Sequence, residues 1–282
     1  MFSTISYIAP DGVETITFND GNGYLINSGG LKGLSGSSDD IAVELPWGGQ
    51  RFVNIKNNPM ECTLSIIVEG NGAEEETQQR VKRLRSMFSR MASGSLTLDN
   101  GDGITYTLDI RQAGAIEVPE IETTLDDIII VDIPIISDNG YWRTSTTAAS
   151  MPDGNVTING VPTQVRRFTF TNTSELPTSG KVVWHGDTEG AIVAIYDQDT
   201  GAVIGSTTLP PAGDTTLAMN LSPRSALMIT DAAGEQQLEK WRAVKGTMFP
   251  VGVNPGERQV IVTNHPNARV FYDVKILDPW EW

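Results

Sequence analysis

Most of the chain alternates between apolar and polar residues with a period of two, the pattern of half-buried β-strands. Clear runs of this kind stand at 104–110, 217–221 and 270–276. Leu96 and Leu98 precede the first run across the turn residues Asp99–Gly103, so the pattern predicts a β-hairpin at 95–110. Short strands separated by turn residues are typical of sandwiches and barrels.

One segment departs from this alternation and has helical spacing. Its apolar residues recur every three or four positions, at Val81, Leu84, Phe88 and Met91. Glu74–Glu76 lie at its start, where carboxylates favour the positive end of the helix dipole, and Gly94 suits its end. The pattern predicts one α-helix at about 74–93, which packs on a sheet through the four apolar residues.

The length of 282 residues and the mass of 30.5 kDa predict two domains. The most linker-like segment is 144–154, which is small, polar and ends in turn residues. We therefore expect a mainly β protein: an N-terminal β-sandwich-like domain with one α-helix at 1–143, then a second β-sandwich domain at 155–282. The last strand, 269–277, is expected to be buried on one face, at Val270, Tyr272, Val274 and Ile276.

The charge balance excludes two classes of partner. The chain carries 20 basic and 35 acidic residues, a net charge of −15, of which −11 falls within 1–143. Proteins that bind duplex nucleic acid or anionic membranes use lysine and arginine to neutralise phosphates, so neither is an expected partner. The longest apolar run near the middle, Ile128–Val131, is far too short to span a membrane, and the N-terminus shows no secretory signal.

Residues for catalysis or metal binding are few. Cys62 is the single cysteine, so an intrachain disulfide and a cysteine-based zinc site are both excluded. His185 and His265 stand apart, and no G-x-S-x-G serine accompanies them. We therefore predict that the protein is not an enzyme and that it binds no cofactor. We also predict that it has no catalytic, cofactor-binding or metal-binding residue. With 35 acidic residues, a glycosidase that uses two carboxylates stays open, although no pair is singled out.

Several motifs have a structural explanation. Asp99–Gly103 and Asp197–Gly201 start like calcium loops, but Ile110 and Thr208 occupy the position of the required glutamate, so both are predicted to be hairpin turns. Gly29–Gly36 lacks the spacing of a phosphate-binding loop and is interpreted as a flexible loop or subunit arm.

Three further groups of residues are compatible with surface roles. The basic cluster, Arg80, Lys82, Arg83 and Arg85, is interpreted as a solvated helix face or a subunit contact. Six tryptophans could stack on sugars or pack in cores: Trp47, Trp142, Trp184, Trp241, Trp280 and Trp282. Asn155 and Asn172 each begin a glycosylation-like triplet, which we interpret as turn chemistry.

The order of these elements resembles that of the distal tail protein family of siphovirus-type bacteriophages. The resemblance runs over essentially the whole chain and depends on the order of elements, with no short signature. In the first domain it is carried by the early strands, the helix, the hairpin and the segments 127–134 and 140–143. In the second domain it is carried by 156–160, 165–172, 253–258 and 278–282.

The resemblance implies a structural role without chemistry. Family members form a ring, usually a hexamer, at the end of the tail tube, and the first domains close it around the DNA exit channel. The second domain, expected to be a galectin-like sandwich, projects toward the receptor-binding apparatus. The expected partners are further copies of the chain, the tail tube protein, the tail-tip hub protein and receptor-binding proteins, with DNA passing through unbound. The expected location is the distal end of the tail in the virion.

Two other functions stay open. The second domain can instead be a carbohydrate-binding host-adsorption module, and the whole chain can be a tail-associated cell-wall hydrolase. A multimer in solution distinguishes the ring protein, glycan binding that depends on an exposed tryptophan distinguishes the lectin, and degradation of cell-wall material distinguishes the hydrolase.

Overall fold

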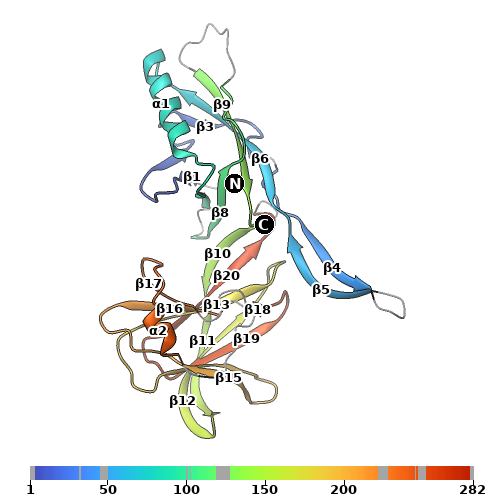
Figure 1. Cartoon of the computed structure of the whole chain (residues 1–282), viewed down its shortest axis with the longest axis vertical. Coiled ribbons are helices and arrows are strands. Elements are labelled where there is room, and N and C mark those ends of the chain that lie inside the picture. Colours follow the sequence, from blue (N-terminus) through green and yellow to red (C-terminus); the bar gives the residue numbers. More distant parts are fainter. Residues whose placement is uncertain are drawn as a thin grey trace. The chain divides into compact units, whose positions relative to one another are not determined.

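A computed structural model describes residues 4–31, 33–44, 50–99, 101, 103–118, 128–221, 228–244, 246 and 252–279. Within these residues the chain forms twenty β-strands and two α-helices (Figure 1). The prediction of a mainly β protein with an α-helix in its first half is confirmed. The chain divides into two compact units, unit 1 with Met1–Thr144 and Ile276–Trp282, and unit 2 with Ser145–Lys275.

Unit 1 is built from antiparallel strands and one long helix. Its elements are β1 (Thr4–Ile8), β2 (Thr15–Phe18), β3 (Tyr24–Ile26), β4 (Ser38–Glu44), β5 (Gln50–Asn57), β6 (Met60–Glu69), α1 (Glu74–Met87), β7 (Gly94–Asp99), β8 (Thr105–Gln112), β9 (Ile128–Ser137) and the start of β10 (Trp142–Thr147). One set of strands pairs in the order β2-β1-β7-β8. A second set pairs in the order β9-β6-β3. The end of β8 pairs with β9 and so connects the two sets.

The core of unit 1 follows the alternation in the sequence. Leu96, Leu98, Leu108 and Ile110 are fully buried on the β7–β8 hairpin, which confirms the hairpin predicted at 95–110. Helix α1 packs on β6 and β9 and contributes Val81, Leu84 and Met87 to the core. Burial of this apolar stripe, rather than helix propensity, supplies most of the stability of a helix of this length.

The predicted helix is too long at its C-terminal end. Helix α1 ends at Met87, and Phe88 has an extended backbone with φ −91° and ψ 136°. The Ser89 hydroxyl accepts the N–H groups of Met91 and the next residue, a local turn that competes with helical hydrogen bonds. Met91 is 95% exposed, so its predicted packing is wrong, whereas Phe88 is buried and stacks on Tyr7 with ring centroids 4.1 Å apart.

Strands β4 and β5 form a hairpin of their own. They pair from Ser38 opposite Asn57 to Glu44 opposite Gln50, and among the described residues neither strand pairs with any other. Asn58 closes the base, since its N–H donates to the Ser37 carbonyl at 2.9 Å and its Nδ2 donates to the Asp39 carboxylate at 3.0 Å. In Figure 1 the hairpin leads away from β6.

Unit 2 is a sandwich of two antiparallel sheets. Its elements are the rest of β10, β11 (Ala149–Ile158), β12 (Val161–Thr171), β13 (Thr178–His185), β14 (Ile192–Tyr196), β15 (Val203–Thr208), β16 (Thr216–Asn220), β17 (Ile229–Asp231), α2 (Leu238–Arg242), β18 (Gly252–Val253), β19 (Arg258–Thr263) and β20 (Arg269–Ile276). One sheet has the order β11-β12-β19-β14-β15. In the other, β17, β16, β13 and β20 are neighbours in that order, and β18 also pairs with β13.

The main core of unit 2 lies between these sheets. Trp184, Val270 and Tyr272 from one sheet meet Phe170 and Ile261 from the other. Tyr272 stacks on Phe170 with ring centroids 3.9 Å apart. The predicted terminal strand is confirmed, because Val270, Tyr272 and Ile276 are buried and Val274 is half-buried.

The segment interpreted as a linker, 144–154, lies in strands instead. Strand β10 continues to Thr147 and β11 begins at Ala149, so Ala148 is the one residue between them. The Ala148 N–H donates to the Val270 carbonyl at 2.9 Å, and Ala149 lies opposite Thr169. Small polar residues form strands here because backbone pairing does not depend on an apolar side chain.

Candidate functional site

The first aspartate of each acidic turn accepts hydrogen bonds from backbone N–H groups of the same turn. Asp197 Oδ1 accepts the N–H of Asp199 at 2.9 Å and of Thr200 at 3.3 Å, and closes the turn between β14 and β15. Asp99 Oδ1 accepts the Gly101 N–H at 2.7 Å in the turn between β7 and β8. Across the described residues, no group of three or more histidine, cysteine, aspartate or glutamate side chains could hold a metal ion.

The histidines and the cysteine lie apart and have separate roles. His185 is exposed at the end of β13, and its Nδ1 lies 3.0 Å from the Thr215 carbonyl. His265 is buried in the turn after β19, where its Nδ1 accepts the Asn267 N–H at 3.2 Å and burial lowers its pKa. Burial raises the pKa of the Cys62 thiol to about 11, which leaves little of the thiolate that a nucleophile needs.

Two tryptophans are structural and one is partly exposed. Trp142 is fully buried in unit 1, where its Nε1 donates to the Leu34 carbonyl at 2.8 Å. Trp184 is buried in unit 2 and donates to the Pro210 carbonyl at 2.9 Å. Neither ring can stack on a sugar, whereas Trp241 on α2 is 44% exposed. Trp47, Trp280 and Trp282 lie outside the described residues.

The end of the glycine-rich segment Gly29–Gly36 is held by hydrogen bonds to other parts of unit 1, which corrects its interpretation as a flexible loop or subunit arm. Leu34 is buried and its carbonyl holds Trp142, while the Gly36 N–H donates to the Leu277 carbonyl at 2.7 Å. A Cβ on Gly36 would lie 2.5 Å from the Gly140 carbonyl oxygen, so the glycine is needed for this close approach. Lys32 lies outside the described residues.

The basic cluster on α1 divides into one structural and three exposed residues. Arg80 is half-buried, donates to the Glu69 carbonyl and forms an ion pair with Glu76, both at 2.5 Å, which ties α1 to the end of β6. Lys82, Arg83 and Arg85 are exposed, and none forms an ion pair with a carboxylate in the described part of the chain. These three residues therefore remain candidates for a subunit contact.

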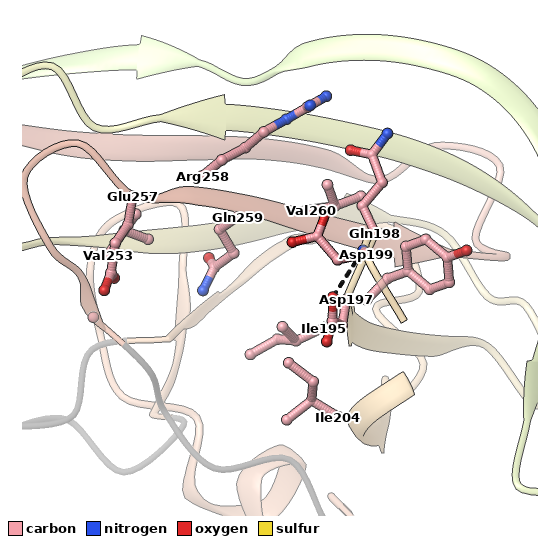
Figure 2. Close-up of a pocket in the computed structure, with 12 residues that line it drawn as sticks. Ile195, Asp197, Gln198, Asp199, Ile204, Val253, Glu257, Arg258, Gln259 and Val260 are labelled. Carbon is pink, nitrogen blue, oxygen red and sulfur yellow. Dashed lines mark hydrogen bonds between the residues drawn. The ribbon is translucent and has the colours of Figure 1, made fainter. Parts of the chain in front are cut away.

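Unit 2 carries a pocket of about 500 Å³ beside the turn between β14 and β15. Figure 2 shows Asp197, Gln198 and Asp199 on one side of it and Glu257, Arg258 and Gln259 on the other. Arg258 is fixed by a hydrogen bond from its Nε to the Thr169 hydroxyl at 2.9 Å, and Gln259 accepts one from the Tyr272 hydroxyl at 2.8 Å.

The carboxylates of this pocket are suited to accepting hydrogen bonds. Hydrogen bonds from the Thr200 side chain and from the N–H groups of Thr200 and Asp199 lower the pKa of Asp197. Hydrogen bonds from the side chain and the N–H of Asn254 likewise lower the pKa of Glu257. A two-carboxylate glycosidase needs one carboxyl whose pKa is raised so that it stays protonated. Asp197 and Glu257 are shifted in the opposite direction, so the pocket offers ionised acceptors and no general acid among these two.

This pocket was not found from the sequence, although both of its turns were. Asp197–Gly201 and the Asn254–Pro255–Gly256 turn are evident as turns, but they stand more than fifty residues apart. Antiparallel pairing of β14 with β19 brings the two turns to one end of the same sheet.

Asn172, interpreted from the sequence as a turn residue, is fully buried, and its Nδ2 donates to the carbonyls of Leu176 and Val253. No helix among the described residues is long and apolar enough to cross a membrane.

Comparison with known proteins identifies the fold. No protein-family model and no curated protein matches the chain. The structure is similar to the crystal structure of SPP1 Dit (gp 19.1), with a TM-score of 0.57 and 12% sequence identity. The match covers 97% of this chain and 99% of that chain, and that protein is described as a paradigm of hub adsorption apparatus in phages that infect Gram-positive bacteria. At this identity the likeness shows the fold alone, and the chain therefore has a Dit-like fold that extends through both units.

Proposed function

We propose that this protein is a structural component of a bacteriophage tail, a hub protein at the distal end that joins the tail tube to the host-adsorption apparatus. The observation that carries the proposal is the fold match to SPP1 Dit, which covers 97% of this chain and 99% of that one. A single sandwich recurs in many unrelated proteins, so it says little about function. A match through two different units is more selective than a match to one.

We further propose that the chain assembles into a closed hexameric ring. The β4–β5 hairpin supports this, because a lone two-stranded hairpin is only marginally stable in water and leaves its backbone edges available for pairing. Pairing with a neighbouring copy satisfies those edges by adding strands to a sheet. Head-to-tail contacts of this kind close into a ring when the rotation between copies permits.

The ring surrounds the channel through which DNA leaves, and its other partners are the tail tube protein, the tail-tip hub protein and receptor-binding proteins. The segment 1–143 carries −11 of the net charge of −15. Carboxylates on a channel wall repel the duplex over about 8 Å at physiological ionic strength and so keep it from binding. We therefore propose a wall with more Asp and Glu than Lys and Arg, and place Lys82, Arg83 and Arg85 away from it.

Electron microscopy and light scattering of the purified protein test this assembly. We expect rings with a central hole and a mass about six times the 30.5 kDa of one chain. A chain that stays monomeric at all accessible concentrations and shows no rings would contradict the ring. A channel wall that proves neutral or basic in a ring reconstruction would remove the charge argument and leave the ring intact.

A hairpin deletion tests the contact that closes the ring. Replacing 41–54 by a short glycine turn leaves the base at Ser37, Asp39 and Asn58 in place. We expect the deleted protein to stay folded and monomeric, with a melting temperature that no longer rises with protein concentration. The matched control replaces the exposed turn at Val13, which is 82% exposed, and should still form rings. Rings formed by the deletion variant would show that the hairpin is not the contact.

A further inference from the structure

A second pocket of unit 2 has a charge character opposite to that of the chain. This pocket, of about 690 Å³, is lined by Arg166, His185 and Arg269, together with apolar and neutral residues that include Phe271 and Asn267. No carboxylate is among its described lining residues, although the protein has 35 acidic and 20 basic residues. Arg166 and Arg269 form no ion pair with any carboxylate in the described residues.

The strand register places Arg269 and His185 on the outer face of one sheet, and Arg166 comes from β12 of the other sheet and is joined to the segment before β20 through the carbonyls of Pro266 and Ala268. Arg269 lies opposite Val183 in the pairing of β20 with β13, and His185 lies opposite Thr216 in the pairing of β13 with β16. The alternating residues on the other side, such as Val270, are in the core, so Arg269 points out of the sheet and is exposed. The two guanidinium groups and the imidazole therefore converge because of the fold, and they are far apart in the sequence.

Two of the three groups are held in position before any ligand binds. Arg166 donates from Nη1 to the carbonyls of Pro266 at 2.6 Å and Ala268 at 3.1 Å, and its guanidinium lies 5.2 Å from the centre of the Phe168 ring. The Nδ1 of His185 faces the Thr215 carbonyl at 3.0 Å and must donate to it, which leaves Nε2 for a ligand. Fixed donors lose little conformational entropy on binding.

We propose that this pocket, formed by Arg166, His185 and Arg269 beside Phe271, binds the phosphate group of a sugar phosphate. Guanidinium groups match the geometry of phosphate oxygens with two parallel hydrogen bonds. Phe271 and Val183 give an apolar wall for the C–H face of a small ring, and Asn267 offers an amide for its hydroxyl groups. The high negative charge of the whole chain disfavours a nucleic acid as the source of the phosphate. This site does not depend on the role in a tail.

Ligand titration of the full chain at low ionic strength tests the proposal, with glucose 6-phosphate, inorganic phosphate and glucose as probes. We expect saturable binding of glucose 6-phosphate, weaker binding of inorganic phosphate, and binding of glucose at least about tenfold weaker, because hydrogen bonds to charged groups carry the affinity. Added salt should weaken the binding of both phosphates. Glucose binding equal to that of glucose 6-phosphate would overturn the assignment, and so would stronger binding of an oligonucleotide.

Single substitutions locate the site. Arg269→Ala should weaken glucose 6-phosphate binding about tenfold or more, since it removes an exposed charged donor whose side chain forms no ion pair with a carboxylate in the described residues. His185→Ala is a second variant, which should also weaken binding. Arg242→Ala removes the same charge from α2 and should leave affinity unchanged. Unchanged affinity in both pocket variants, or an equal loss in Arg242→Ala, would overturn the proposal, whereas ring formation would be unaffected in every case.

Discussion

Asn172 offers the sharpest test of how unit 2 is held together, because its buried amide connects three backbone segments. Nδ2 donates to the carbonyls of Leu176 at 2.9 Å and Val253 at 2.8 Å, and Oδ1 accepts the N–H of Ser174 at 3.0 Å and its hydroxyl at 2.6 Å. In Asn172→Ala the Ser174 hydroxyl keeps the Leu176 carbonyl, 3.1 Å away. The Val253 carbonyl and the Ser174 N–H lose their partners.

The size of the effect follows from these two groups. Each buried polar group without a partner costs about 1 to 3 kcal/mol, so Asn172→Ala should lower the free energy of unfolding by about 2 to 6 kcal/mol. For a unit of this size, at about 4 °C per kcal/mol, that corresponds to a fall in melting temperature of about 8 to 24 °C. Differential scanning calorimetry can follow the unit 2 transition separately if the two units unfold in separate steps.

Two comparisons make the result specific. Asn155 begins the same kind of triplet but is exposed, so Asn155→Ala should change the free energy of unfolding by less than about 0.5 kcal/mol. Asn172→Asp sets carboxylate oxygens against two carbonyls and should destabilise at neutral pH. It should recover in part as the pH falls, because a protonated carboxyl donates one hydrogen bond again. A unit 2 transition in Asn172→Ala that matches the parent protein would refute the reasoning.

Three further predictions concern the core and its titration. Phe88→Ala should cost about 3 to 5 kcal/mol in chemical unfolding, because the buried ring that stacks on Tyr7 leaves a cavity; an unchanged denaturation midpoint would contradict this. The pKa of His265 is lowered by burial, so the unfolded chain binds more protons and stability should fall as the pH drops below about 6.5. His265→Gln should reduce this pH dependence, as melting curves between neutral and acidic pH will show. Deleting 269–282 removes β20 and should abolish the unit 2 transition in calorimetry; a transition that persists at the parent temperature would mean that β20 is dispensable.

Local pattern was enough to predict the elements whose side chains alternate strictly. The β7–β8 hairpin, the start of α1 at Glu74 and the strand β20 all lie where the periodicity places them. In each case one face is apolar and the other polar, and burial of the apolar face fixes both the element and its register. The end of α1 was missed because Met91 fits the helical spacing, while the competing Ser89 turn leaves only a weak signal.

Other features depend on residues that meet only in the folded chain. The sequence of 144–154 has the composition of a linker, yet backbone pairing of Ala149 with Thr169 makes it a strand. The two pockets of unit 2 described above combine residues from strands far apart in the sequence, so no spacing rule could select them. Asn172 looks like any turn asparagine until its amide meets the carbonyls of Leu176 and Val253.

The sequence by itself determined the mainly β class, the acidic first half and the order of elements, because period, charge and turn residues are local properties. The tertiary structure decided which polar residues are buried, which cations converge and that β4 and β5 pair only with each other among the described residues. The burial of a side chain and the approach of two charged groups both depend on contacts between segments that are distant in the sequence. They are therefore determined only when the strands pair. The difference between Asn155 and Asn172, two asparagines in equivalent triplets with opposite environments, follows from that pairing.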